Sequence, residues 1–188
     1  MTIYDLNGQE LFRGSEDLGK ISLRGLRLNQ ANLHGADLDG VDLTSADLRQ
    51  SDLQTAQLCG AVLVSANLRQ CNLVGAFLMN ADLRNADLSD SNAYWSCFVG
   101  ANLSDAILER AILSGVNLTN ASLVNARLCS CDLTPSGLGE GVQLVGADLT
   151  GANLEGADLT GAIYSLRTRF PIGFNPQKFS MKLVDDPN

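Results

Sequence analysis

Residues able to support catalysis are few in this sequence, and their spacing keeps them apart. The single histidine is His34, which follows Leu33, and a general base needs a reactive group within hydrogen-bond reach. Serines and aspartates are plentiful, but none stands in a motif with a histidine, and no glycine-rich phosphate-binding motif is present. We therefore interpret His34 as a surface residue, and we expect neither an enzyme nor a bound cofactor.

The cysteines offer metal-binding or disulfide chemistry, and Cys129 and Cys131 have the closest spacing. In the five-residue frame described below, Cys131 takes an inward position and Cys129 an outward one, so the two thiols cannot share a tetrahedral metal ion. Cys71 also points inward, but it lies three coils from Cys131, roughly 14 Å at normal strand spacing and too far for a disulfide. We expect no metal site and five free thiols, as in a reducing compartment.

Charge and composition narrow the class of partner. The 188 residues carry a formal net charge of −8 with a sequence pI near 4.5, so phosphate backbones and anionic membranes would repel the protein. The N-terminal residues lack the basic and apolar regions of a signal peptide, and no apolar stretch approaches a membrane span. We predict a cytoplasmic protein that binds neither nucleic acid nor membrane directly.

A period of five residues dominates the chain. Every fifth residue from Leu23 to Leu138 forms a series of 24 positions, and leucine fills all but Ala93 and Phe98. On an α-helix, residues five apart are rotated by about 140°, and on a flat strand they alternate between faces, so both would expose many leucines. Because each buried leucine is worth roughly 1.5–3 kcal/mol, we predict a coil in which all of them face one interior.

The positions around each leucine fit such a coil. Alanine holds 14 of the 24 positions that lie two residues before the leucine series, where a small side chain leaves room in the interior. Glycine recurs two residues after the leucines, where an unhindered backbone suits a turn. These glycines are Gly35, Gly40, Gly60, Gly75, Gly100 and Gly115. The residues just before the leucines are mostly aspartate or asparagine, which we expect to face solvent.

The frame breaks once. After Leu138 the next leucine is Leu144, six residues on, and the series then continues to Tyr164. Proline and glycine are frequent between Pro135 and Gly141, so we predict a one-residue bulge and not a functional loop.

These repeats resemble the pentapeptide-repeat family, whose pattern is Ala-Asp/Asn-Leu-x-x. Direct matches include Ala36-Asp37-Leu38, Ala66-Asn67-Leu68, Ala101-Asn102-Leu103 and Ala157-Asp158-Leu159. The resemblance covers residues 21–164 and is similar to the leucine-rich subgroup abundant in cyanobacteria. It implies an all-β fold, a right-handed quadrilateral β-helix with four pentapeptides per coil.

The two ends fall outside the repeat. Residues 1–20 predict a hairpin with a type I′ turn at Asn7-Gly8 that caps the first coil. Residues 165–188 contain several aromatic residues and predict a C-terminal cap, with a short helix beginning at Asn175-Pro176. A homodimer formed through this end cap is the alternative, since capping and dimerisation both cover apolar surface.

An aromatic cluster interrupts the polar surface of the predicted coil. With four sides per coil, its outward members lie on neighbouring coils, and we interpret them as a partner-binding patch or as a patch covered by a terminal segment. Trp95 is placed at a corner between Gly75 and Gly115, so we expect nothing above or below to cover its ring. The predicted patch consists of Val74, Phe77, Met79, Tyr94, Trp95 and Val99.

These features favour a non-enzymatic protein-binding or scaffold protein. The alternative is a DNA mimic that binds or protects a topoisomerase such as DNA gyrase, as other members of the family that the chain resembles do. Residues 21–164 hold 15 acidic residues and 7 arginines, about one net charge per 4 Å of the predicted rod, against one per about 1.7 Å for duplex DNA. Leucine in place of phenylalanine at the central position also departs from the gyrase-protecting type.

Overall fold

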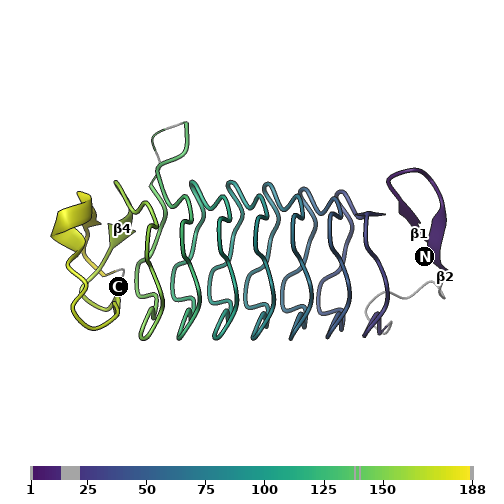
Figure 1. Cartoon of the computed structure of the whole chain (residues 1–188), viewed down its shortest axis with the longest axis horizontal. Helices are drawn as coiled ribbons and strands as arrows, with labels where there is room; N and C mark the ends of the chain where they lie inside the picture. Colours follow the sequence, from purple (N-terminus) through teal and green to yellow (C-terminus); the bar gives the residue numbers. More distant parts are fainter. Residues whose placement is uncertain (1, 14–21, 138, 140, 187–188) are drawn as a thin grey trace.

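The computed structural model describes residues 2–13, 22–137, 139 and 141–186. They form one elongated stack of coils, with a hairpin at the N-terminal end and a compact cap at the C-terminal end (Figure 1). Parallel bridges join residues 20 apart, as in Ser22↔Asp42 and Asp42↔Val62. Four pentapeptides therefore complete each coil, which confirms the right-handed quadrilateral β-helix.

Each corner of the coil is a β-turn closed by the same hydrogen bond. The N–H of Ala31 donates to the carbonyl of Leu28 (3.0 Å), and this pattern recurs every five residues. The third residue of the turn, Gln30 here, has a positive φ of 59°, as a type II turn requires. The chain therefore turns after every pentapeptide and returns each leucine to the interior.

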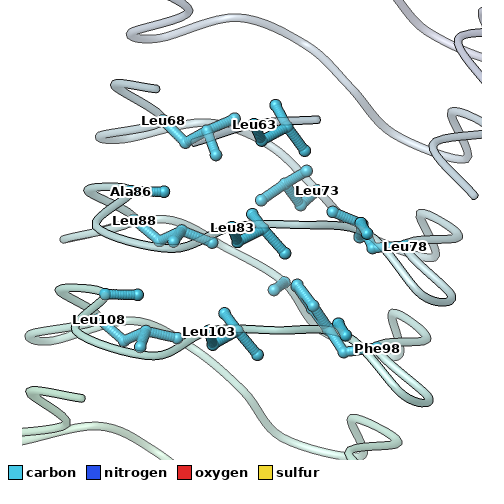
Figure 2. Close-up of a cluster of buried hydrophobic side chains, with 14 of the residues drawn as sticks. Leu63, Leu68, Leu73, Leu78, Leu83, Ala86, Leu88, Phe98, Leu103 and Leu108 are labelled. Atoms are coloured by element: carbon cyan, nitrogen blue, oxygen red, sulfur yellow. The ribbon is translucent and has the colours of Figure 1, made fainter. Parts of the chain in front are cut away.

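The interior is a set of leucine columns. Leu63, Leu83 and Leu103 lie one above another, as do Leu68, Leu88 and Leu108, and all are at most 1% exposed (Figure 2). Phe98 continues the column of Leu78 and is also buried. Because neighbouring coils shield both rims of each coil, the stack buries a continuous apolar core.

The N-terminal hairpin pairs with the first coil. Strand β1 (Thr2–Asp5) lies between β2 (Glu10–Arg13) and β3 (Ala31–Asn32), and both pairings are antiparallel. The predicted type I′ turn is wrong, because that turn needs a positive φ at Asn7 as well as at Gly8, and only Gly8 has one (84°). The N–H of Gly8 donates to the carbonyl of Asp5 (3.0 Å), and the Asp5 carboxylate accepts from the N–H of Asn7 (2.9 Å), which favours a type I turn followed by a glycine bulge.

The C-terminal residues cover the other end of the core. Strand β4 (Ile163–Tyr164) pairs in parallel with β5 (Lys182–Leu183), and the 3-10 helix η2 (Pro176–Phe179) begins after the capping residue Asn175. A ladder of rings covers the last coil, with successive centroid separations of 5.6, 4.8 and 5.0 Å. Its members are Tyr164, Phe170, Phe174 and Phe179.

The predicted one-residue bulge is also wrong. Ile112 bridges Asp132, 20 residues on, whereas Asn117 bridges Gln143, 26 residues on, so the coil contains six extra residues. Leu133 and Leu144, both buried, therefore occupy equivalent positions on either side of the insertion. The predicted frame position Leu138 lies outside the described residues. The described residues at this insertion project from the side of the stack in Figure 1, and we call residues 134–137 and 139 the inserted loop.

Candidate protein-interaction surface

One of the four sides of the solenoid carries no charged residue over six consecutive coils. The bridge column that runs through Gln57, Phe77, Cys97, Asn117, Gln143 and Ile163 marks this side. Between the flanking corners, the sequence contains no Asp, Glu, Lys, Arg or His in residues 55–60, 75–80, 95–100, 115–120, 141–146 and 161–165. We call these six segments the uncharged side. Charge flanks this run at both ends, at Asp37 and Asp39 on the first coil and at Lys182, which pairs with Ile163.

Exposed apolar side chains of the uncharged side lie near its middle. Phe77 is 40% exposed and Met79 is 38% exposed. Phe77 bridges Cys97 on the next coil, and the N–H of Asn80 donates to the carbonyl of Val99 (2.9 Å). The structure therefore brings Phe77, Met79 and Val99 together on one flat surface, in the register that the four-sided frame predicts.

Tyr94 and Trp95 form a second part of the predicted patch at the corner of this side. Their rings are parallel within 8°, with centroids 6.1 Å apart. The indole does not lean toward Phe77. It extends toward the following coil and lies over Gly115, where an added methyl group would be 2.4 Å from Cδ1. Val74 is half-buried on the adjoining side, next to the coil segment of Tyr94, whose carbonyl accepts from the N–H of Gly75 (2.9 Å).

The inserted loop partly covers this corner. The N–H of Gly137 donates to the Tyr94 hydroxyl (3.3 Å), and Ser136 packs beside the backbone of Gly115. Trp95 is nevertheless 43% exposed. The expectation that nothing lies above or below the indole is wrong, because it packs on Gly115 of the next coil. The segment that contacts Tyr94 at this corner is internal, not terminal. The missed signal was the inserted length of six residues between Leu133 and Leu144.

The residues with chemical potential stay apart. His34 is exposed, and its Nδ1 lies 3.7 Å from a carboxylate oxygen of Asp52. Cys71 and Cys131 point inward as predicted, and their thiols donate to the carbonyls of Leu48 (2.9 Å) and Leu108 (2.7 Å). Burial raises the pKa of both thiols to about 12, so they remain protonated and unreactive near neutral pH. Within the described ranges, no group of three His, Cys, Asp or Glu residues is arranged to hold a metal ion.

Several arginines on the other sides pair with carboxylates. Arg49 and Asp47 form a two-point contact (2.8 and 2.7 Å), and Arg84 and Asp82 repeat it with the same distances. These contacts lower the pKa of each aspartate, chiefly through the hydrogen bonds from the guanidinium. No helix in the described part of the chain has the length and apolar character needed to cross a bilayer.

Comparison with known proteins relates this solenoid to a family. The model for pentapeptide repeats matches in eight copies, over residues 17–55, 27–63, 61–95, 96–134 and 140–163. No curated protein sequence matches the chain significantly.

Two solved structures are informative. HetL from the cyanobacterium Nostoc sp. strain PCC 7120, a pentapeptide repeat protein involved in heterocyst differentiation regulation, is 34% identical with a TM-score of 0.68. The alignment covers 77% of this chain and 59% of HetL, so the chain spans less than two thirds of that protein. QnrB1, a plasmid-mediated fluoroquinolone resistance protein, is 18% identical with a TM-score of 0.56 over 87% of this chain and 77% of QnrB1. That likeness concerns the fold alone.

Proposed function

This chain belongs to the pentapeptide-repeat family, and from that premise we propose that it is a non-enzymatic scaffold that binds a protein partner through its uncharged side. The observation that carries the proposal is the run of six coils without charge on a molecule of net charge −8. Removing charged groups from water is costly unless they are paired. The uncharged side is therefore the surface that a partner desolvates at least cost.

The apolar residues near the middle of the uncharged side could form the core of an interface. Cores of protein interfaces are depleted in charge and enriched in aromatic residues and methionine. Phe77, Met79 and Val99 supply such a core, and Trp95 stands at its edge. The inserted loop frames one margin through its hydrogen bond to Tyr94.

A matched pair of charge insertions tests the proposal. Phe77 and Ile112 occupy the same position in their repeats and are 40% and 42% exposed, but Ile112 lies on the adjoining side. We expect Phe77→Lys to abolish recovery of a partner from host extract, while Ile112→Lys retains it and both melt close to the unmodified protein. Equal recovery by both variants, or equal loss, would contradict a site on the uncharged side.

Trp95→Ala tests the edge of the surface. The core leucines are untouched by this substitution, so we expect the fold to persist while partner binding weakens by about 2 kcal/mol or more, as for many interface tryptophans. A fall in melting temperature of many degrees with partner recovery intact would instead assign Trp95 to anchoring the inserted loop.

The alternative functions have less support. In DNA mimicry, acidic side chains must present an uninterrupted negative surface, yet Arg49, Arg84 and Arg110 each bind a carboxylate at 2.7 Å. The likeness to QnrB1 extends to the fold only. A homodimer through the C-terminal cap draws support from three exposed apolar residues there, Leu166, Ile172 and Leu183.

A further inference from the structure

A polar groove lies on a different side of the solenoid from the uncharged side. It has a volume of about 330 Å³ and is lined by Asn29, Arg49, Gln50, Arg69 and Gln70. These residues occupy the same two repeat positions on three successive coils, which the bridges Arg27↔Asp47 and Asp47↔Asn67 hold side by side. The groove therefore runs along the stack axis and presents one guanidinium per coil over two coils.

Side-chain amides of three glutamines form a ladder along the stack, in which the amide N–H of one glutamine donates to the glutamine of the following coil. Nε2 of Gln30 donates to Oε1 of Gln50 (3.1 Å), and Nε2 of Gln50 donates to Oε1 of Gln70 (3.0 Å). The amide oxygens of both glutamines that line the groove, Gln50 and Gln70, thus already accept a hydrogen bond. The Nε2 of Gln70, at the end of the ladder, has no protein acceptor among the described residues, and Gln70 lines the groove, so this amide keeps donors available there.

The guanidinium groups also keep donors available. Arg49 uses Nε and Nη2 on Asp47, which leaves Nη1 without a protein partner in the described part of the chain. Arg69 contacts Asp87 and Asp90 only at 3.5 Å through Nη1 and Nη2, which leaves Nε. No carboxylate lines the groove.

Carboxylates stand around this groove but not in its lining. On this side Arg27, Arg49 and Arg69 are balanced by Asp47 and by Asp87 and Asp90 of the following coil, which contact Arg69. The groove therefore has the character of an anion site through its unpaired guanidinium and amide donors, and not through net local charge.

We propose that this groove binds a phosphate group. A phosphate presents at least three acceptor oxygens, and donors reach the groove from three separate side chains, Arg49, Arg69 and Gln70. A planar carboxylate would be satisfied by one guanidinium fork alone. The groove is independent of the proposed docking side, so either proposal stands or fails without the other.

The test is a titration with inorganic phosphate at constant ionic strength, followed by NMR of the arginine Nε–H and side-chain amide signals. We expect saturable shifts confined to the groove residues, and weaker binding of acetate. Arg49→Gln should weaken phosphate binding about tenfold, the loss expected for one charge-assisted hydrogen bond.

Arg84→Gln is the matched control. Arg84 binds Asp82 with the same two distances as Arg49 binds Asp47, and both arginine side chains are 53% exposed, but Arg84 lies outside the groove. This variant should leave the dissociation constant unchanged. Shifts that rise linearly without saturation, equal losses in the two variants, or acetate binding as tight as phosphate would overturn the proposal.

Discussion

The indole of Trp95 lies across the backbone of Gly115, so close that a methyl group on that glycine would stand 2.4 Å from Cδ1 and 2.7 Å from Nε1. Real side chains do not approach this closely, so the glycine is a condition for the observed position of the ring. Trp95 is the only tryptophan in the chain, and its fluorescence therefore reports directly on this contact.

Gly115→Ala should displace the indole and shift its emission to longer wavelength, because the ring moves further into solvent. Gly75→Ala is the control: Gly75 stands at the same corner with a similar φ (64° against 69°), but its nearest neighbour would be Thr55 at an ordinary 3.6 Å. Both variants pay about 1 kcal/mol for a side chain in the left-handed region, and only Gly115→Ala should change the spectrum. Identical emission from the two proteins would show that the ring is placed by other contacts.

Ala93 and Phe98 should compensate for one another in the core. They are consecutive central positions, both are buried, and they are the two exceptions to leucine between Leu23 and Leu133. Ala93→Leu alone should destabilise by about 1–3 kcal/mol through overpacking, and Phe98→Leu alone by about 1 kcal/mol through lost volume. In denaturant unfolding, the double variant should lose less than the sum, whereas simple additivity would mean that the two side chains pack independently.

Thiol labelling of the native protein should distinguish inward-facing cysteines, which stay unlabelled, from outward-facing ones, which react. Cys71 and Cys131 are buried with their pKa raised to about 12, so at about pH 8 the native protein should carry label only on outward thiols. Burial, with a contribution from Asp39, also raises the pKa of Cys59, so we expect Cys97 and Cys129 to react first. Peptide mass spectrometry measures the pattern, and denatured protein labelled at all five sites is the control. Rapid native labelling of Cys71 would contradict the inward orientation.

Acid should weaken the fold through the outward aspartates. Hydrogen bonding to Thr44 lowers the pKa of Asp42, and hydrogen bonding to Thr160 lowers that of Asp158. Because the folded pKa lies below the unfolded value of about 3.9, this stabilisation is present above that pH and is lost as pH falls through the folded pKa. The melting temperature should therefore fall below about pH 4. Asp42→Asn, which keeps an acceptor oxygen, should show a smaller fall; an unchanged pH profile would remove Asp42 from this account.

Supercoiling assays separate scaffolding from DNA mimicry. We expect excess purified protein to leave topoisomerase activity unchanged, because the paired arginines interrupt the acidic sides. Inhibition or drug protection that added salt abolishes would be the signature of a charge-based mimic and would favour the alternative function.

The five-residue frame could be predicted because it follows from burial alone. Each leucine must reach the interior, and no helix or strand satisfies that spacing, so a turn after every pentapeptide follows without knowledge of any distant contact. The same logic placed Cys71 and Cys131 inward and Phe77 outward. It failed between Leu133 and Leu144, because a leucine at the expected spacing in the sequence made an insertion of six residues look like a shift of one.

Sequence by itself thus determined the coil, its leucine interior and the residues available on its surface, because these depend on neighbours within five residues. The tertiary structure decided the features that depend on contacts between residues 20 or more apart in the sequence. The indole of Trp95 can lie against Gly115 because that residue of the next coil has no side chain, and Tyr94 meets Gly137, 43 residues further along the chain, because the inserted loop lies at this corner. The uncharged side belongs to this second class: its segments are separate in sequence, and only stacking at the observed coil lengths of 20 and 26 residues joins them into one surface.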